Sequence, residues 1–349
     1  MPPDLAPKVS VVLLTYNHER YIREALESVA AQKTDFAIEL LISEDHSTDG
    51  TRDEIARFLA GYKGEVRLFY SEANQHAAIV ATRALRAARG KYVAYLDGDD
   101  YWSSDVKLQR QVDFLEAHPD CVLCHHDVGR VDESGELLRI LPGLQRRASI
   151  DDLIQGNFIH SCSAMVRRSA IEDIPDWMDA LPIIDWPLYL LATEHGSVGW
   201  VEGTLAHYRV HAGSVWSTAS ETRQWAGSLA MLAVMEEHFG SSRREVFAAS
   251  RGKLTQKLLE ALGREEKRGV TEIAAREREI AASQRADQSA GEARAAVAEA
   301  ERRADVALGE FAYELYRIRR TTRRILAIST ALGAGMVAMI ALLAGILIG

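Results

Sequence analysis

The feature that most constrains the fold is the regular alternation of two hydrophobic periods in the first 100 residues. Residues 9–15 form a nearly continuous run of β-branched residues and leucine, which is typical of a strand buried on both faces. Residues 19–32 then place apolar side chains at helical spacing. The same order repeats along the chain, and it predicts strands over 9–15, 39–43, 66–70 and 92–96 and helices over 19–32, 51–60 and 77–88. This alternation predicts an α/β fold whose mostly parallel sheet carries helices on both faces and ligands at the carboxyl ends of its strands.

Charge and cysteine content narrow the possible functions. The net charge of −9 argues against a nucleic-acid binder, which would present a basic face. The three cysteines do not suggest a disulfide framework, and the first residues lack the cleavage site of a secretory signal. We therefore expect the folded part to lie in a reducing, cytosolic environment.

The last third of the sequence changes character. Residues 219–263 read as a helical extension, and residues 264–324 are rich in Ala, Glu and Arg, as in a long helix or a coiled-coil stalk that could form a homo-oligomer. Residues 325–349 contain no charge and are long enough for a transmembrane helix. Five arginines between 317 and 324 should remain on the cytoplasmic side. This pattern predicts a single-pass protein of the cell inner membrane or plasma membrane, with residues 1–324 cytoplasmic.

Three carboxylates follow the predicted strand 92–96 within four residues. Asp97, Asp99 and Asp100 would repel one another unless a cation lay among them. Carboxylate and phosphate oxygens suit Mg²⁺ or Mn²⁺. A plain turn rich in Asp and Gly is the alternative. The buried strand directly before the cluster favours a metal site.

A second polar cluster follows the strand 39–43. Ser47, Thr48 and Asp49 are expected to cap the next helix. Asp45 is the residue we expect to bind a ligand, because a carboxylate there can accept a hydrogen bond from a base N–H or a ribose hydroxyl.

The chain resembles glycosyltransferase family two over residues 8–218. The segments LLTYNHERYIREALESV, LISEDHSTDGT and GKYVAYLDGDDYW look like the family's three signature segments, and GNFIHSCSAMVRRS, IIDWPLYLLATEHG and YRVHAGSVWS agree with later ones. Each motif alone is weak, but their order and spacing together are specific. The resemblance implies the GT-A fold for residues 1–218, with a Rossmann-like sheet, and inverting transfer of a sugar from a nucleotide-diphosphate donor, expected to be a UDP-sugar.

The resemblance also implies roles for individual residues. Residues expected to bind the nucleotide-sugar are Thr15, Tyr16, Asn17, Asp45, Asp97 and Asp99, with Asp45 reading the uracil. Residues expected to bind the divalent metal are Asp99, Asp100 and His211, the last of which could instead contact the diphosphate. The chain departs from the family pattern at His76 and Val80, where a glycine and a second asparagine are frequent, and this departure could alter donor preference.

Asp185 stands where the family places its general base. A carboxylate there would take the proton of the acceptor hydroxyl, and its apolar neighbours would raise its pKa by desolvation. The alternative is a helix N-cap, and both roles are compatible. The expected acceptor is a glycan or a lipid-linked glycan of cell-surface polysaccharide synthesis.

Two other functions remain open from the sequence. A nucleotidyltransferase would also use acidic residues and a metal, but it usually needs a glycine-rich phosphate loop that TYNHERY lacks. A catalytically inactive, membrane-tethered scaffold would use the stalk and the anchor alone. The pattern Cys121, Cys124, His125 matches a haem-attachment motif, but it lies in the apolar run CVLCHHDV, where a strand with buried thiols is expected.

Overall fold

The computed structural model describes residues 6–75, 77–214, 216, 218–286, 302, 303 and 306. The chain divides into two compact units, Met1–Thr255 and Gln256–Gly349. The first unit contains the whole sheet, and the site described below lies within it.

The first unit is built on one eight-stranded sheet. Its strands are β1 (Val9–Thr15), β2 (Ile38–Glu44), β3 (Glu65–Tyr70), β4 (Tyr92–Asp97), β5 (Cys121–Val131), β6 (Leu137–Leu141), β7 (Met165–Arg167) and β8 (Ser197–Arg209). They lie in the order β3-β2-β1-β4-β7-β5-β6, and β8 pairs with β5. The predicted strands and helices of the first 97 residues are confirmed, with ends displaced by at most three residues.

The sheet is mixed: the predicted parallel arrangement holds for its first half and for the pair β5 and β8, whereas the other pairs of its second half are antiparallel. Strands β3, β2, β1 and β4 are parallel to one another. β7 runs antiparallel to both β4 and β5, and β6 runs antiparallel to β5. β7 spans only three residues, so it has too few side chains to produce a recognisable period in the sequence.

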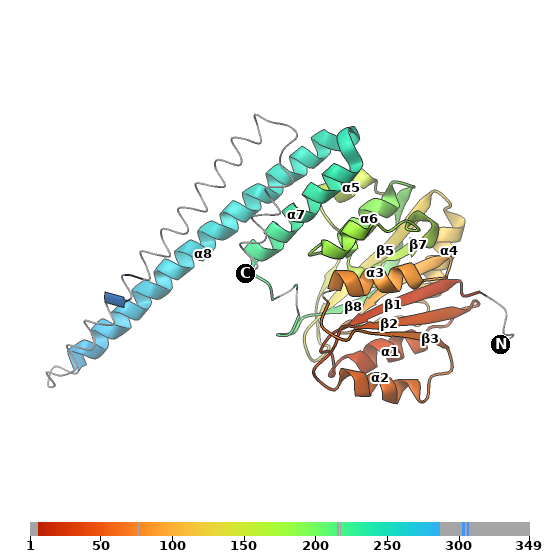
Figure 1. The fold of residues 1–349 in the computed structure, drawn as a ribbon, viewed down its shortest axis with the longest axis horizontal. Helices are drawn as coiled ribbons and strands as arrows, with labels where there is room; N and C mark the ends of the chain where they lie inside the picture. Colours follow the sequence, from red (N-terminus) through yellow and green to blue (C-terminus); the bar gives the residue numbers. More distant parts are fainter. Residues whose placement is uncertain are drawn as a thin grey trace. The chain divides into compact units, whose positions relative to one another are not determined.

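Helices cover both faces of the sheet. In chain order they are α1 (Ile22–Ala30), α2 (Thr51–Leu59), α3 (Ala77–Ala87), α4 (Lys107–Ala117), α5 (Ile150–Gln155), α6 (Asp185–Thr193), α7 (Glu221–Phe239) and α8 (Arg244–Ala286). Figure 1 shows α1 and α2 on one side of β1–β3 and α3 and α6 on the other. The helix α8 crosses the boundary between the two units.

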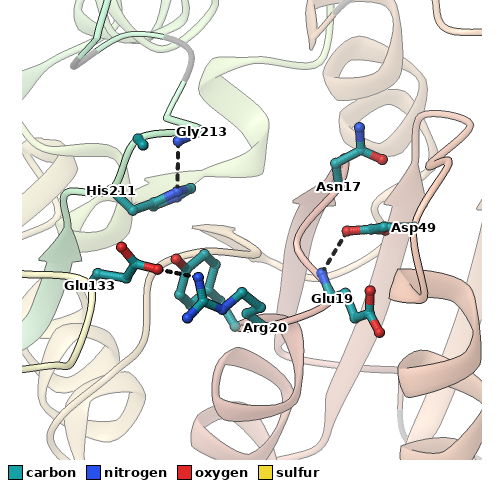
Figure 2. A pocket seen from close by; sticks show the side chains of 9 residues that line it. Asn17, Glu19, Arg20, Asp49, Glu133, His211 and Gly213 are labelled. Atoms are coloured by element: carbon teal, nitrogen blue, oxygen red, sulfur yellow. Dashed lines mark hydrogen bonds and ion pairs between the residues drawn. The ribbon is translucent and has the colours of Figure 1, made fainter.

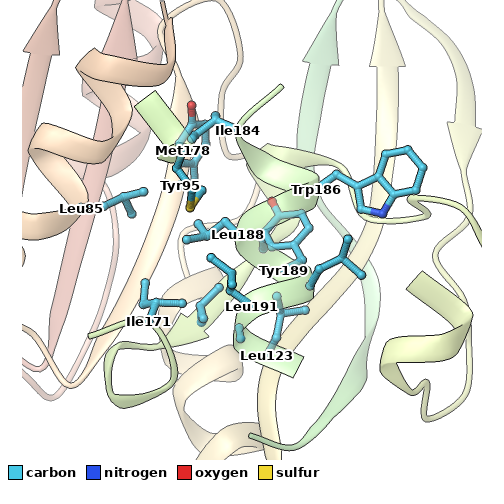
Figure 3. Close-up of a cluster of buried hydrophobic side chains, with 14 of the residues drawn as sticks. Leu85, Tyr95, Leu123, Ile171, Met178, Ile184, Trp186, Leu188, Tyr189 and Leu191 are labelled. Carbon is cyan, nitrogen blue, oxygen red and sulfur yellow. The ribbon is translucent and has the colours of Figure 1, made fainter. Parts of the chain in front are cut away.

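The sheet divides the hydrophobic core into two clusters, because successive side chains of a strand point to opposite faces. On β1, Val12 and Leu14 pack into one hydrophobic cluster, whereas Val11 and Leu13 pack into the other. The first cluster includes residues of α3 and α6, several of which appear in Figure 3, and it also takes in Met231 of α7. The second includes residues of α1, α2 and α4. Every residue of β1 is buried, which agrees with its unbroken apolar sequence.

The predicted transmembrane helix, residues 325–349, lies outside the described residues, as does most of the predicted stalk, 264–324. Within the described part of the chain, no helix combines the length and apolar character needed to cross a bilayer.

A lysine is enclosed in the core. Lys107, at the start of α4, is fully buried; its Nζ donates to Gln111 Oε1 at 2.7 Å and lies 4.3 Å from the centre of the Trp102 ring. Desolvation lowers the pKa of Lys107 to about 7. The unfolded chain, in which a lysine has a pKa of about 10.4, therefore binds more protons than the folded chain between about pH 7 and 10.

We predict that this lysine makes the folded chain more stable as the pH rises. The free energy of unfolding should gain roughly 1 kcal/mol per pH unit from this group between about pH 7 and 10. Replacing Lys107 with Met should remove that gain, whereas the same change at the exposed Lys63 should leave it in place. Urea unfolding followed by tryptophan fluorescence at pH 7, 8 and 9 measures the slope. An unchanged slope in K107M would contradict the prediction.

Candidate active site

The polar residues gather at one edge of the sheet because β1, β2 and β4 are parallel and end side by side. Thr15 pairs with Glu44, and Leu14 pairs with Asp97, so the loops after these strands lie next to one another. This edge is where ligands bind in open α/β sheets. The predicted nucleotide and metal residues of the first 100 positions all lie at this edge.

Asp99 lies between two histidines. Its Oδ2 is 3.1 Å from His211 Nε2 and 3.7 Å from His18 Nε2. These three side chains offer ligand atoms within 4.8 Å of one another, and they are the one such group of three found among the described residues. The arrangement brings Asp99 and His211 together, as expected. His18 was missed, because no sequence pattern marks a single histidine in the loop after β1.

The electrostatics of this group favour binding of a cation. Burial opposes ionisation of Asp99, but the hydrogen bond with His211 and the neighbouring His18 outweigh it and hold the pKa of Asp99 below its usual range. Burial also lowers the pKa of His18, although the charge of Asp99 opposes this effect, and a neutral imidazole has a lone pair for a metal ion. Two imidazoles and a carboxylate suit Mn²⁺ better than Mg²⁺, which prefers oxygen ligands.

Asp100 does not join this group. Its side chain is buried, and its Oδ1 accepts a hydrogen bond from Arg209 N at 2.9 Å. The Arg209 side chain, also buried, donates from Nε to Asp99 O at 3.0 Å and lies over the rings of Tyr21 and Tyr101. This contact holds the loop, and the metal contact of Asp100 stays a prediction. Sequence reasoning missed Arg209.

Asp97 contacts a different segment of the chain from the one that carries His211. Ser161 Oγ donates to its Oδ2 at 2.9 Å, and burial together with the charge of Asp99 raises the pKa of Asp97 to about 7. The charge of Asp185 also raises the pKa of Asp97, so these two carboxyl groups lie close enough to interact electrostatically. Asp97 thus links the histidine group to the region around Asp185.

Asp185 is the first residue of α6, and Ile184 occupies the N-cap position. Its Oδ2 accepts a hydrogen bond from Asn157 Nδ2 at 3.1 Å. Burial raises the pKa of Asp185, although the bonds from the Trp186 N–H and from Asn157 oppose the rise. The residue as a whole is half-buried. A half-buried carboxylate with a raised pKa is suited to accept a proton near neutral pH.

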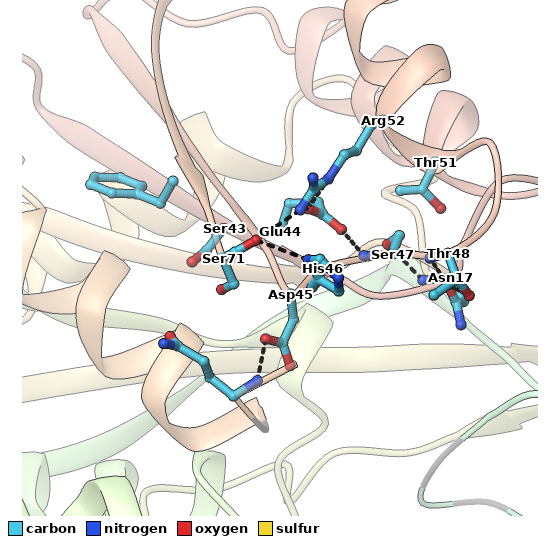
Figure 4. Close-up of polar contacts among 12 residues, drawn as sticks. Asn17, Ser43, Glu44, Asp45, His46, Ser47, Thr48, Thr51, Arg52 and Ser71 are labelled. Carbon is cyan, nitrogen blue, oxygen red and sulfur yellow. Dashed lines mark hydrogen bonds and ion pairs between the residues drawn. The ribbon is translucent and has the colours of Figure 1, made fainter. Parts of the chain in front are cut away.

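The loop after β2 is organised by a buried acid (Figure 4). Glu44 is fully buried; it accepts hydrogen bonds from Ser47 N and Arg52 Nε, and Arg52 also donates to Ser71 O at 2.9 Å. This fixes the adjacent Asp45, whose Oδ1 accepts from Gln75 N at 2.7 Å. Asp45 is 5% exposed, so its carboxylate is anchored on one side and little open to solvent.

The expected capping of α2 by Ser47 or Thr48 is wrong. The helix begins at Thr51 after Gly50, without a side-chain cap at that position. Ser47 and Thr48 instead bind Asn17: Ser47 Oγ accepts from Asn17 N at 2.9 Å, and Asn17 Oδ1 accepts from Thr48 N at 2.8 Å. Asp49 does bind the start of the helix, because its Oδ1 accepts from Thr51 N.

The predicted nucleotide residues after β1 occupy different environments. Thr15 is buried, and its Oγ1 lies 3.3 Å from His18 Nδ1. The Tyr16 side chain is 36% exposed and free to cover a planar ligand. Asn17 adopts a φ of 54°, a left-handed conformation that asparagine tolerates better than most residues, and this turn brings His18 back toward Asp99.

A pocket of about 270 Å³ opens beside the histidine group. Figure 2 shows Asn17, Glu19 and Asp49 on one side and His211, Gly213 and Glu133 on the other. Arg20 lies between the two sides and forms an ion pair with Glu133. The pocket thus joins the predicted nucleotide loop to His211, but neither Asp45 nor Asp185 lines it.

We predict that His18 contributes to metal binding. Loss of even an outer partner of a metal ligand typically costs 10–100-fold in affinity, so His18→Ala should weaken Mn²⁺ binding at least about tenfold. Titration calorimetry on the full chain measures the change, and the exposed His195→Ala serves as the control. Normal Mn²⁺ affinity in a His18→Ala protein that melts like the parent would exclude this role.

Comparison with known proteins agrees with this fold. The sequence model of glycosyl transferase family 2 matches residues 10–175. The uncharacterized protein Rv1520 of Mycobacterium tuberculosis is 37% identical over 219 residues, which are 62% of this chain and 62% of that protein, so the chain spans less than two thirds of that relative. A candidate teichuronic acid biosynthesis glycosyltransferase of Bacillus subtilis, TuaG, is 30% identical over 222 residues, which cover 62% of this chain and 86% of TuaG.

Solved structures share the fold at lower identity. S. aureus TarS 1-349 in complex with UDP-GlcNAc aligns with a TM-score of 0.51 and 20% identity, covering 73% of this chain and 80% of TarS. The mannosyltransferase PcManGT of Pyrobaculum calidifontis in complex with GDP-Man and Mn²⁺ aligns with a TM-score of 0.53 and 18% identity, covering 81% and 84% of the two chains. With a family match over β1–β7 and a relative covered over most of its length, the chain belongs to glycosyltransferase family 2.

Proposed function

We propose that this glycosyltransferase moves a sugar from a UDP-sugar to an acceptor hydroxyl with inversion, and that it needs Mn²⁺ or Mg²⁺. The observation that carries the proposal is that Asp97 interacts electrostatically with two neighbours: Asp99, which lies with His18 and His211, and the half-buried Asp185. One centre suits a diphosphate with its metal, and the other suits an attacking hydroxyl. The UDP-GlcNAc bound to TarS and the GDP-Man and Mn²⁺ bound to PcManGT support a nucleotide-sugar donor.

The donor side is built to hold a nucleotide diphosphate. A bound divalent ion would act as a Lewis acid that neutralises the leaving diphosphate. Asp99, His211 and His18 would hold that ion, whereas Asp100 would keep the loop in place through Arg209. Asp45 and the exposed ring of Tyr16 would bind the uridine, each from a loop that other residues already fix.

The acceptor side supplies the base. As the acceptor oxygen bonds to the anomeric carbon, the bond from that carbon to the diphosphate oxygen breaks, and the hydroxyl proton passes to Asp185. Asn157 orients the carboxylate by its hydrogen bond to Oδ2. A single base on the face opposite the leaving group gives direct displacement and therefore inversion.

We further propose that the acceptor is a glycan or a lipid-linked glycan of cell-surface polysaccharide synthesis and that residues 325–349 anchor the chain in a membrane. The teichuronic acid assignment of TuaG supports such an acceptor, and the uncharged C-terminal run supports the anchor. The family assignment removes the nucleotidyltransferase alternative.

A donor screen tests the proposed function. Purified full chain with Mn²⁺ is offered a panel of UDP-, GDP- and dTDP-sugars, and release of the nucleotide is measured with and without EDTA. We expect a UDP-sugar to be turned over and EDTA to stop the reaction. Turnover that is equal with and without EDTA would refute the metal requirement, and absence of turnover with every donor would favour the inactive scaffold.

We predict that Asp185→Asn slows turnover about 10²–10⁴-fold while UDP and Mn²⁺ bind normally. Asparagine keeps the size of the side chain but cannot accept the proton. Because burial raises the pKa of Asp185, kcat/KM of the parent should fall on the acid side at a pH above the usual aspartate value, as the base becomes protonated. Asp173→Asn, at an exposed aspartate, is the matched control. Near-normal turnover in Asp185→Asn would remove Asp185 from the mechanism.

We predict that deletion of residues 325–349 releases an active enzyme from membranes. The deleted run carries no charge, and the arginines before it would remain at the new end of the chain. Fractionation of expressing cells compares the full and shortened chains. If the shortened chain still sediments with membranes, another part of the protein must bind lipid.

A further inference from the structure

The hydroxyl of Tyr189 is a buried donor without a partner. Tyr189 lies on α6 and is 1% exposed, and its ring packs in the first hydrophobic cluster (Figure 3). Its hydroxyl oxygen is enclosed, and no atom in the described part of the chain forms a hydrogen bond with it. A buried hydroxyl without a partner opposes folding, whereas a phenylalanine ring would fill the same space without that cost. The unpaired hydroxyl therefore points to a role beyond the packing of the core.

Helix geometry places this hydroxyl beside the predicted base. Tyr189 follows Asp185 by four residues, so the two side chains lie on the same face of α6. Side chains of a helix lean toward its N-terminus, which carries the Tyr189 ring over the turn that begins with Asp185. The charges of Asp185 and Asp97 both raise the pKa of Tyr189, after the larger effect of burial. The hydroxyl thus lies close enough to both carboxyl groups to interact electrostatically with them.

A second tyrosine already serves one of these carboxyl groups. Burial raises the pKa of Asp97, and a hydrogen bond with the Tyr95 hydroxyl is among the contacts that lower it. Ser161 Oγ also donates to Asp97 Oδ2. Asp185 has one side-chain donor among the described residues, Asn157. Asp185 is therefore the carboxylate that has room for the Tyr189 hydroxyl.

The surroundings of Asp185 offer hydrogen bonds instead of positive charge. The titratable groups near Asp185 and Tyr189 are Asp97 and Tyr95 on β4 and Cys162 in the 3₁₀ turn η1 (Ser161–Ser163). No cation among the described residues influences the pKa of Asp185, so its ionised form depends on hydrogen-bond donors. A sugar bound over the half-buried Asp185 would remove solvent from the carboxylate and increase that dependence.

We propose that Tyr189 is a positioning residue, whose hydroxyl donates a hydrogen bond to the Asp185 carboxylate when the donor sugar covers it. The inference rests on the proposed function, because it names the group that keeps the base of that site ionised. A hydrogen bond to the charged form favours ionisation, so Asp185 remains a proton acceptor after its solvent is lost. Asn157 holds Oδ2 of the carboxylate, and Tyr189 holds the same group from α6.

Tyr189→Phe removes the hydroxyl and keeps the ring, so it tests this role without creating a cavity. Nucleotide release by the full chain is measured from pH 5 to pH 9 with Mn²⁺, with water as the acceptor and with a saturating amount of the UDP-sugar that the donor screen identifies. Because the base must be ionised, kcat falls on the acid side, and loss of the hydroxyl should move that fall to higher pH by about one unit or more. Below the new midpoint, kcat should be about tenfold lower than in the parent, and the deficit should disappear at alkaline pH.

Tyr92→Phe is the matched control for packing. Tyr92 is fully buried at the other end of β4, and its hydroxyl donates to Glu116 Oε1 at 2.8 Å and accepts from Arg167 Nη1 at 3.1 Å. Tyr92→Phe should lower the melting temperature by roughly 2–4 °C and leave the pH profile of kcat unchanged. Tyr189→Phe should melt at or above the temperature of the parent, because its hydroxyl has no partner in the part of the chain that the structure describes.

A double variant shows whether the hydroxyl acts through the base. Asp185→Asn/Tyr189→Phe should turn over no more slowly than Asp185→Asn alone, because two groups that act as a unit are not additive. A slower double variant would give Tyr189 an action independent of Asp185 and overturn the proposal.

Two further results would overturn it. One is an acid limb of kcat in Tyr189→Phe that coincides with that of the parent. The other is a loss of stability in Tyr189→Phe as large as that in Tyr92→Phe, which would reveal a structural partner for the hydroxyl. A parent that turns over no donor would refute the proposed function and this inference with it, whereas an active parent with an unaltered Tyr189→Phe would refute the inference alone.

Discussion

The geometry of the site depends on the buried guanidinium of Arg209. Its Nε donates to Asp99 O, and its other nitrogens donate to Glu133 O and to the carboxylate of Glu24. The backbone N–H of Arg209 donates to Asp100. One side chain at the end of β8 therefore joins the acidic loop after β4, the turn between β5 and β6, and helix α1. Without the guanidinium, the acidic loop would lose its side-chain connection to the turn between β5 and β6 and to α1.

The loop after β4 shifts the pKa values of two of its carboxyl groups in opposite directions. Asp99 is held ionised by His211 and His18, whereas Asp97, two residues away, titrates near pH 7 because burial and the charge of Asp99 both oppose its ionisation. Their side chains leave the loop in different directions, one toward the histidines and the other toward Ser161. This separation of pKa values allows one short segment to serve a cation on one side and remain close to a proton acceptor, Asp185, on the other.

The sequence predicted what depends on local periodicity and on order along the chain. The strands before Asp45 and Asp97 could be read from their apolar runs, and the family's motifs placed Asp99 and His211, which the structure brings to 3.1 Å. His18 could not be found in this way, because its approach to Asp99 depends on the left-handed turn at Asn17. The hydrogen bond from Arg209 N to Asp100 could not be predicted either, because it joins residues that are 109 positions apart. The antiparallel half of the sheet was missed because β7 is three residues long and pairs only with distant segments.

Core and site are also joined through the start of α4. Gln111 Oε1 accepts from the buried Lys107, and Gln111 Nε2 donates to Ser163 O at 2.8 Å, while Trp102 Nε1 donates to Cys162 O at 3.1 Å. Cys162 and Ser163 continue the segment in which Ser161 binds Asp97 and Asn157 binds Asp185. The buried amine of Lys107 thus lies where α4 holds the segment on the acceptor side of the sheet. A more apolar residue at 107 would remove that desolvation cost but would also free Gln111, and with it the register of the segment that carries both acidic contacts.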